Sequence, residues 1–247
     1  MARDDWDLHW VELAAATSRN PAQALRRRIV RSLLRAPDRG ARILDVGCGQ
    51  GDLIADVRRR WPHAELCGID RSSCATELAR SRVPDARFVR RDVLAGGDPD
   101  SDLAGWATHA VCSEVLEHVD EPALLVRNAR GYFASGCRLV VTVPGGPMSA
   151  FDRHIGHRRH YTPASLRSLL TGAGLEVEMA TGAAFPFFNL FRMAVILRGE
   201  VILNDARGEG AGSPSLPMRA AMGAFRPLLA LPVPHNRWGW QIVGVAR

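Results

Sequence analysis

The sequence contains no lysine, because all 32 of its basic residues are arginines. Arginine stays protonated at any working pH, so catalysis through a lysine Schiff base, a lysine general base or a phosphate-loop lysine is excluded. The 32 basic residues outnumber 26 acidic ones, which leaves a net charge of +6 with histidine neutral. A general base in this chain must therefore be a histidine, a carboxylate or a tyrosine.

No cysteine pair has the CxxC spacing, and no run of 18 apolar residues occurs. The five cysteines are Cys48, Cys67, Cys74, Cys112 and Cys137. Three of them lie in apolar runs typical of strands, so we expect reduced, buried thiols in a cytoplasmic protein. The first residues carry two aspartates where a secretion signal would be basic, so neither secretion nor a membrane span is predicted.

Aromatic residues make up only 6% of the chain, and its arginine doublets are scattered. A nucleic-acid partner is therefore not favoured, in spite of the positive net charge. A hydrophobic fraction of 47% and a charged fraction of 23% are typical of a soluble globular chain with a sizeable core. The sequence does not predict an oligomeric state.

From residue 41 onwards, apolar runs typical of strands alternate with helical patterns. Strands are predicted at residues 43–46, 65–69, 87–89, 107–112, 138–143 and 175–179, and helices at 52–60, 121–132 and 163–170. Such alternation predicts an α/β fold with a Rossmann-like, doubly wound sheet that is mostly parallel. Residues 239–246 are predicted to return to this sheet as an antiparallel last strand.

Two regions lie outside this core of residues 41–180. Residues 1–40 are predicted to form a helical cover, in which Arg26, Arg27 and Arg28 form a solvated face. Residues 181–237 are predicted to be an inserted apolar cap, with helices at 193–197 and 218–231 and a linker between them. Residues 238–247 complete the core. The apolar insertion has a second interpretation, which is peripheral contact with a membrane surface.

A glycine-rich turn follows the first predicted strand. Gly47, Gly49 and Gly51 alternate with other residues, and Asp52 opens the next helix. A dinucleotide-binding fingerprint would have glycine at position 52, where an acidic side chain would instead repel a pyrophosphate. The turn therefore suits a cationic or zwitterionic ligand better than a dinucleotide, and an NAD-dependent oxidoreductase is the less favoured alternative.

The spacing Asp45-x-Gly47-x-Gly49-x-Gly51 resembles motif I of the class I S-adenosylmethionine-dependent methyltransferases. Acidic residues also follow the second and third strands, as in that family, at Asp70 and Asp92. The resemblance implies S-adenosylmethionine as cofactor, with its methionine end at the glycine turn, its ribose at Asp70 and its adenine at Asp92. The predicted cofactor residues are Asp45, Gly47, Cys48, Gly49, Gly51, Asp70, Arg71, Asp92, Val93 and Ser113. Taken singly, each could instead be a turn or capping residue.

Two glutamates and a histidine follow the fourth strand. On a helical turn, Glu114 would share a face with Glu117 at i+3 and with His118 at i+4. Two carboxylates and an imidazole on one face suit a divalent cation, either Mg²⁺ or, because of the nitrogen ligand, Zn²⁺ or Mn²⁺.

This Glu-x-x-Glu-His pattern resembles that of the ubiquinone-biosynthesis O-methyltransferases and of small-RNA 2′-O-methyltransferases. The latter family adds a later histidine, for which His157 is at the matching place. The resemblance implies metal ligands at Glu114, Glu117, His118 and His157, with Glu114, His118 and His157 as catalytic candidates. One alternative is a metal-free general base at His118 or His157. In the other, these residues are structural and Glu117 caps a helix.

Three further residues are predicted to contact a small-molecule acceptor. Arg158 would bind an anionic group or pair with a surface acid, Tyr161 would line the acceptor pocket or pack as a hydrophobic staple, and Phe185 belongs to the apolar insertion. We therefore expect O-methylation of a small apolar or lipid-like metabolite. Alternatives are a metal-free N- or C-methyltransferase of a secondary metabolite, and a non-catalytic cofactor-binding partner protein.

Overall fold

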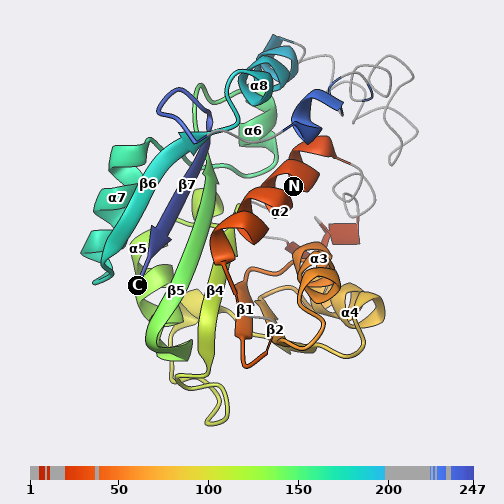
Figure 1. The fold of residues 1–247 in the computed structure, drawn as a ribbon, viewed down its shortest axis with the longest axis vertical. Coiled ribbons are helices and arrows are strands. Elements are labelled where there is room, and N and C mark those ends of the chain that lie inside the picture. Colours follow the sequence, from red (N-terminus) through yellow and green to blue (C-terminus); the bar gives the residue numbers. More distant parts are fainter. Residues whose placement is uncertain are drawn as a thin grey trace.

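A computed structural model describes residues 6–8, 10–11, 20–36, 39–197, 223, 225, 227–231 and 235–247 (Figure 1). The strands are β1 (Arg42–Val46), β2 (Glu65–Asp70), β3 (Arg87–Arg90), β4 (Ala107–Ser113), β5 (Phe133–Pro144), β6 (Val177–Ala183) and β7 (Gln241–Ala246). The helices are α2 (Pro21–Leu34), α3 (Asp52–Arg60), α4 (Ser73–Arg82), α5 (Pro122–Ala129), α6 (Ala150–His154), α7 (Pro163–Gly172) and α8 (Phe187–Leu197). Short 3-10 helices are η1 (Val93–Ala95), η2 (Leu116–His118) and η3 (Arg130–Tyr132).

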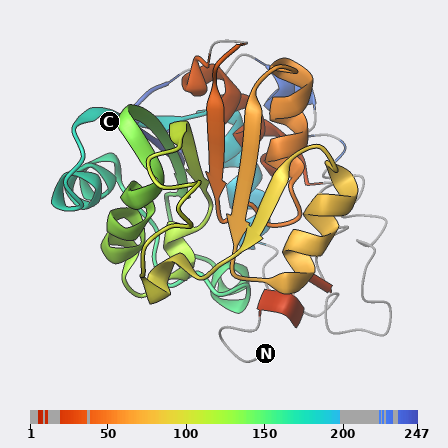
Figure 2. The ribbon, with the colours of Figure 1, turned by 90° about the horizontal axis from the view of Figure 1, so that it is seen from below.

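All seven strands form one sheet, in the order β3-β2-β1-β4-β5-β7-β6. The strands from β3 to β5 pair in parallel, whereas β7 is antiparallel to both β5 and β6. Figure 2 shows the parallel half, with β1, β2 and β3 side by side and α4 beside them. The predicted doubly wound sheet with an antiparallel last strand is therefore confirmed. In such a sheet the crevice between β1 and β4, where the strand order reverses, is the expected ligand site.

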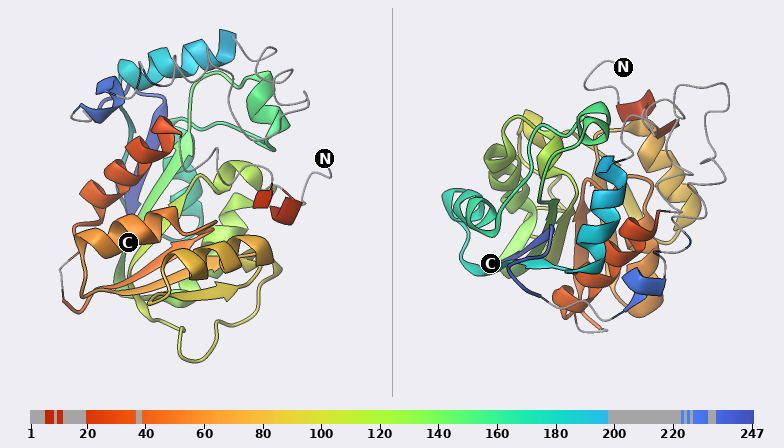
Figure 3. Two further views of the ribbon diagram at one scale, coloured as in Figure 1. Left: turned by 90° about the vertical axis from the view of Figure 1, so that its right-hand side faces the viewer. Right: turned by 90° about the horizontal axis from the view of Figure 1, so that it is seen from above.

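Helices cover both faces of the sheet. Side chains of α2, α3 and α8 join one buried hydrophobic cluster, and side chains of α5 and α7 join the other. Helices α6 and α8 lie at the end of the sheet where β5 finishes (Figures 1 and 3). Within the described residues, no helix is both long enough and apolar enough to cross a membrane.

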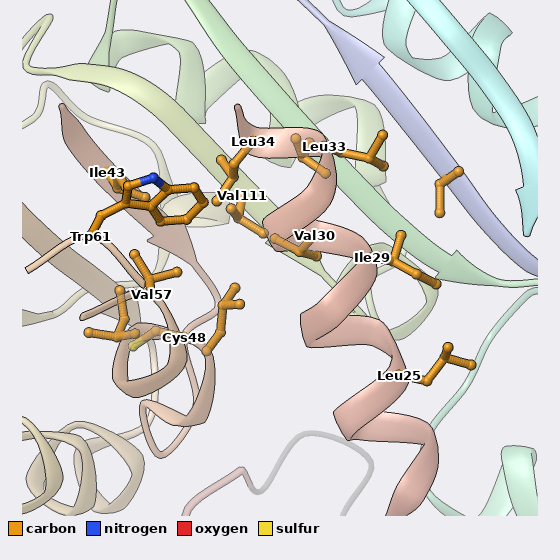
Figure 4. Close-up of a cluster of buried hydrophobic side chains, with 14 of the residues drawn as sticks. Leu25, Ile29, Val30, Leu33, Leu34, Ile43, Cys48, Val57, Trp61 and Val111 are labelled. Atoms are coloured by element: carbon orange, nitrogen blue, oxygen red, sulfur yellow. The ribbon is translucent and has the colours of Figure 1, made fainter. Parts of the chain in front are cut away.

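Helix α2 forms because its sequence caps it and gives it one apolar face. Asn20 accepts a hydrogen bond from the Ala22 amide, and Pro21 occupies the first turn. Leu25, Ile29 and Leu33 recur at helical spacing and are buried. Figure 4 shows this face of α2 beside residues of β1, α3 and β4, including Ile43, Val57, Trp61 and Val111. The helix thereby docks across the centre of the sheet.

Several predicted boundaries shift in the structure. The predicted helix at 121–132 divides into α5 and η3, β5 begins at residue 133, and α8 begins six residues before the predicted position. The sixth strand runs over 177–183 rather than 175–179, because the residues before it belong to the turn that follows α7. The predicted linker at 208–217 and residues 218–222 of the predicted last helix lie outside the described residues. All five cysteines are free, and four of them are buried; Cys74 is only partly buried, contrary to prediction.

Candidate active site

The turn after β1 is built around residues with positive φ. Gly47, Gly49 and Gly51 have φ angles of 75°, 51° and 78°. A Cβ on Gly47 would lie 2.4 Å from Cγ2 of Val115, so no side chain fits there without displacing the neighbouring loop. The Gly47 and Cys48 amides donate to the Ile69 carbonyl at 2.8 and 3.1 Å, which fixes the turn against β2.

The Asp70 carboxylate lies beside this turn, at the end of β2. One oxygen accepts a hydrogen bond from the Gly49 amide at 2.9 Å, and the other accepts one from the Ser72 amide at 2.9 Å. Burial raises the pKa of Asp70, while these hydrogen bonds lower it. Because a carboxylate can accept about four hydrogen bonds, each oxygen retains capacity for a ligand hydroxyl.

Two other predicted cofactor residues have different surroundings. Asp45 is buried at the end of β1, and burial together with the nearby Asp70 raises its pKa to about 7. Asp92 is partly exposed; its carboxylate accepts a hydrogen bond from the Leu94 amide at 3.0 Å and lies 4.0 Å from Nε of Arg71. The crevice therefore has acidic groups at the ends of three successive strands, an electrostatic environment that suits a cation.

Val93, also predicted at the cofactor, is buried at the start of η1. The Ser113 hydroxyl is 2.7 Å from that of Thr142 at the carboxyl end of the neighbouring strand. Cys48 is buried within the glycine turn. The structure thus places these three residues along the same edge of the sheet as the glycine turn.

The predicted helical turn from Glu114 to His118 is wrong. Glu114 has a φ of 58°, in the left-handed region, and the 3-10 helix η2 begins only at Leu116. The Glu114 carboxylate accepts hydrogen bonds from Thr142 at 3.1 Å and from Gln241 at 2.9 Å. It also forms an ion pair with Arg26 at 3.0 Å. These three partners hold Glu114 on the α2 side of the loop, and it does not join the histidines.

Arg26 is not part of a solvated face, contrary to prediction. Its side chain is only 11% exposed, and its Nε donates to Gln241 at 2.9 Å. Its guanidinium carbon also lies 5.7 Å from the ring centroid of Phe188 in α8. The helical spacing of α2 does not indicate this role, because the two partners are far away in the sequence. Glu114 lies in the loop after β4, and Gln241 lies in β7.

Glu117, His118 and His157 are brought together. One potential ligand atom from each lies within 4.8 Å of the others, and the two imidazole rings are 4.7 Å apart between centroids. Glu117 is wholly buried, and neither of its carboxylate oxygens accepts a hydrogen bond from a described residue. Burial and the nearby Glu114 raise the pKa of Glu117. Burial and His118 lower the pKa of His157 to about 2. A carboxyl and two imidazoles this close together could hold a divalent metal ion.

A second group shares His157. It consists of Asp152, His157 and His160, with 3.3 Å between Nδ1 of His157 and Nε2 of His160. Burial opposes ionisation of Asp152, but paired hydrogen bonds from Arg192 at 2.9 and 2.7 Å hold its pKa well below the ordinary value. Arg192, in α8, is thus a buried structural cation. The Asp152 carboxylate is already satisfied and supports the histidines from behind.

The three predicted acceptor contacts differ in their surroundings. Tyr161 is buried, and its hydroxyl donates to the Leu116 carbonyl at 3.0 Å, so it supports η2. Arg158 forms an ion pair with Asp120, the surface-acid alternative. Phe185 is 41% exposed. None of these three is among the potential ligands Glu117, His118 and His157, although the Arg158 amide donates to the Glu117 carbonyl at 2.8 Å.

Residues of the N-terminal segment cover this region. The Trp6 ring meets His118 edge-on, with 4.8 Å between centroids. The Asp7 carboxylate accepts hydrogen bonds from the Ser72 hydroxyl at 2.5 Å and the Cys74 amide at 3.1 Å. Trp10 packs against Gly49, where an added Cβ would lie 2.4 Å from the indole. The predicted cover therefore contacts both the glycine turn and the histidine group.

This sheet order, with a glycine turn after β1 and acidic residues after β2 and β3, defines a class I S-adenosylmethionine-dependent methyltransferase fold. The sequence matches the family profile described as "Methyltransferase domain" over residues 19–180, more than half of the chain. The chain belongs to this family of enzymes.

Two curated relatives illustrate its similarities. A trans-aconitate 2-methyltransferase of Mycobacterium sp. (strain KMS) is 32% identical over 160 residues, which cover 57% of this chain and 60% of that protein. A ubiquinone biosynthesis O-methyltransferase of Thiobacillus denitrificans is 28% identical over 180 residues, covering 64% and 75%. The match thus spans less than two thirds of the first relative.

Solved structures share the fold at low identity. A methyltransferase in complex with the Trm112 methyltransferase activator of Haloferax volcanii has a TM-score of 0.64 and 16% identity, covering all of this chain and 98% of that chain. Phosphoethanolamine N-methyltransferase 2 of Haemonchus contortus, in complex with S-adenosyl-L-methionine, has a TM-score of 0.59 and 13% identity, covering 89% and 51%. These similarities establish the architecture.

Proposed function

We propose that the chain transfers the methyl group of S-adenosylmethionine to an oxygen atom of a small apolar or lipid-like metabolite, with a divalent metal held by Glu117, His118 and His157. The observation that carries the metal proposal is the wholly buried Glu117 carboxylate, whose nearest candidate partners are two imidazoles. The O-methyltransferase in ubiquinone biosynthesis among the relatives supports oxygen as the methyl-accepting atom.

The residues of the glycine turn fit the cofactor. S-adenosylmethionine carries a positive sulfonium, and Asp45 and Asp70 place acidic groups near the carboxyl ends of β1 and β2, where a bound cation would favour their ionised forms. Asp70 is held by two backbone amides and retains acceptor capacity for ribose hydroxyls. The proposed contacts also include Arg71, Asp92, Val93 and Ser113, which follow or end neighbouring strands. When bound, the cofactor supplies an electrophilic methyl group.

The donor set supports one kind of metal over the other. Because Glu114 is engaged by Arg26 and Gln241, the three converging donors are one carboxylate and two imidazoles. Imidazole ligands favour Zn²⁺ over Mg²⁺, which prefers oxygen. A bound cation would lower the pKa of an acceptor hydroxyl. His157 is oriented for this role by His160 and by the Asp152 carboxylate behind it.

A metal-free mechanism is the second candidate, because His118 and His157 lie face to edge in the site and an imidazole can act as a base without a metal. A neutral imidazole has a free lone pair and can accept the proton of an acceptor hydroxyl. His118, 4.7 Å away between ring centroids, would then position the acceptor, and Trp6 would exclude water from the same side. The inserted region at 181–237 is the proposed source of acceptor specificity.

Methyl transfer from labelled S-adenosylmethionine into small-molecule extracts tests the proposal. The wild-type chain should label an extract component, and His118→Ala and His157→Ala should lose at least about a hundredfold in rate. His154→Ala is the matched control, because His154 is exposed on α6 and lies outside both histidine groups.

Chelation separates the two mechanisms. Activity that survives exhaustive chelation and does not respond to added Zn²⁺ or Mn²⁺ would contradict the metal proposal. The proposal of methyl transfer would still stand. Equal labelling by wild type and both histidine variants would instead contradict the catalytic assignment and favour a cofactor-binding protein without catalysis.

A further inference from the structure

Four arginines gather around a hollow on the outer side of α2 and α3. The hollow has a volume of about 490 Å³ and is lined by Arg28, Arg31, Ser32, Arg35, Ala36, Arg60 and Trp61. Arg35 follows α2 and precedes β1, and Arg60 ends α3 shortly before β2. The hollow therefore lies toward the amino ends of the parallel strands, opposite to the candidate active site at their carboxyl ends.

The lining residues that the structure describes include no acidic one. No carboxylate of the described residues lies within ion-pair distance of Arg28, Arg31, Arg35 or Arg60. Their neighbours on the same two helices behave differently, since Arg26, Arg27, Arg58 and Arg59 each pair with an aspartate or glutamate. The unpaired positive charge is thus concentrated at the hollow rather than spread over the helices.

This arrangement carries an electrostatic cost in the absence of an anion. Arg28 and Arg31 are three residues apart on α2, a spacing at which like charges repel on a helix, and Arg35 follows the end of the helix beside them. The Nε atom of Arg31 is buried and makes no hydrogen bond in the described part of the chain. Burial and the nearby Arg31 lower the pKa of Arg28.

Neighbouring contacts hold two of these side chains in place. The Arg28 guanidinium donates to the carbonyls of Leu229, Ala230 and Leu231 at 2.6 to 2.7 Å. The Arg60 guanidinium lies 5.5 Å from the ring centroid of Trp61, which is itself buried in the core (Figure 4). Two of the four cations are thus ordered before any ligand arrives, which reduces the entropy lost on binding.

We propose that this hollow is a binding site for a ligand with two linked phosphoryl groups, separate from the methyltransferase site. The planar guanidinium fork matches phosphoryl oxygens in bidentate geometry, and each phosphoryl group brings roughly 1.5 to 2 negative charges. Because Arg28 is engaged by backbone carbonyls, Arg31, Arg35 and Arg60 are the arginines left for the ligand. Two linked phosphoryl groups, with roughly three to four negative charges, balance these three arginines, which a single carboxylate does not. The diphosphate is either free or part of a nucleotide, and the chemistry at the arginines is the same.

Calorimetric titration with inorganic pyrophosphate at constant ionic strength tests this site. We expect one molecule bound per chain and at least about tenfold weaker binding by the double variant Arg31→Gln/Arg35→Gln. The matched control is Arg127→Gln/Arg167→Gln, which removes two charges from α5 and α7 on the opposite face and should bind as the wild type does. Titration with a nucleoside diphosphate distinguishes the two sources, because only a nucleotide site gains affinity from the nucleoside.

The same titration is repeated with saturating S-adenosylhomocysteine. Unchanged pyrophosphate affinity supports a separate site, whereas competition places the anion in the cofactor crevice and overturns the proposal. Equal affinities of wild type and the Arg31/Arg35 variant, or an equal loss in the control variant, would overturn it too. Circular dichroism and thermal melting of each variant without ligand establish that it is folded.

Discussion

Arg26 and Glu114 form an ion pair of 3.0 Å between Nη2 and Oε2, although they lie 215 and 127 residues before Gln241, which completes the contact. Gln241 of β7 closes the arrangement, because its amide oxygen accepts from Arg26 and its amide nitrogen donates to Glu114. The two charged side chains are only 11% and 12% exposed. This triangle ties α2, the loop after β4 and the antiparallel strand together beside the proposed metal ligands.

Replacing Arg26 should therefore destabilise the fold. In Arg26→Gln the Glu114 carboxylate keeps two hydrogen bonds but loses its counter-charge while remaining largely buried. We expect a loss of about 2 to 3 kcal/mol in the free energy of unfolding, since breaking one partner of a buried pair leaves an uncompensated charge. Urea unfolding at neutral pH measures this loss.

A double-mutant cycle identifies the cause of that loss. Glu114→Gln removes the charge but keeps the shape of the side chain, so Arg26→Gln/Glu114→Gln should be clearly more stable than the sum of the single effects predicts. Additive effects would show that Arg26 acts through its packing on Phe188 instead.

Gly47 provides a second test, through the space that its missing Cβ leaves. Gly47→Ala places a methyl group 2.4 Å from Val115 at a φ of 75°. The control is Gly136→Ala, at a φ of 72° with no atom within 4 Å of the added carbon. We expect about 1 to 2 kcal/mol of destabilisation in the control from backbone strain alone, and at least about 1 kcal/mol more at Gly47.

Binding of S-adenosylhomocysteine to the same two variants is the functional measurement. Calorimetry should show a loss of affinity for Gly47→Ala and none for Gly136→Ala. Normal binding by a folded Gly47→Ala variant would contradict the assignment of this turn to the cofactor.

The sequence was sufficient to predict the fold because local patterns repeat within each strand and helix. Alternation of apolar runs with capped helices specified the parallel sheet, and a short alternating segment specified β7. The boundaries were less predictable. Residues 133–137 belong to β5 although they precede its apolar run, and Tyr132 lies in η3 rather than in α5. Neither difference changes the hydrophobic pattern that was used to place these elements.

The candidate site was predicted only where its residues are close in the sequence or belong to a motif. The glycine turn and the pair Glu117 and His118 are local. Arg26 and Gln241 reach the site through tertiary contacts, and no periodicity indicates them. The sequence does indicate a local role for Asp152, because Ser149 and Asp152 form a capping box whose spacing is visible in the sequence. The sequence does not indicate the ion pair of Asp152 with Arg192, which belongs to α8.

Asp45 should make stability depend on pH. Its pKa is about 7 in the folded chain against an ordinary value of 3.8, so between these values the folded state holds a proton that the unfolded state releases. Stability should therefore fall as pH rises from about 4 to 7, by an amount on the order of 4 kcal/mol at about 1.4 kcal/mol per pKa unit. Asp45→Asn should flatten this dependence in urea unfolding at pH 4.5 and 7.5. The exposed Asp98→Asn is the control, and an unchanged pH slope in Asp45→Asn would contradict the assignment.

Glu117 gives the sharpest test of the metal proposal, because Glu114 provides a matched control three residues away. Glu117→Gln keeps the size of a buried side chain that accepts no hydrogen bond from a described residue, so stability without metal should change by less than about 1 kcal/mol. Its affinity for Zn²⁺ or Mn²⁺, measured by calorimetry, should fall by at least about tenfold. Glu114→Gln should bind metal as the wild type does, because that carboxylate is engaged by Arg26, Thr142 and Gln241.

Equal losses of metal affinity in both variants would instead support the four-ligand site that includes Glu114. Wild-type metal affinity in Glu117→Gln would show that the Glu117 carboxyl is not a metal ligand.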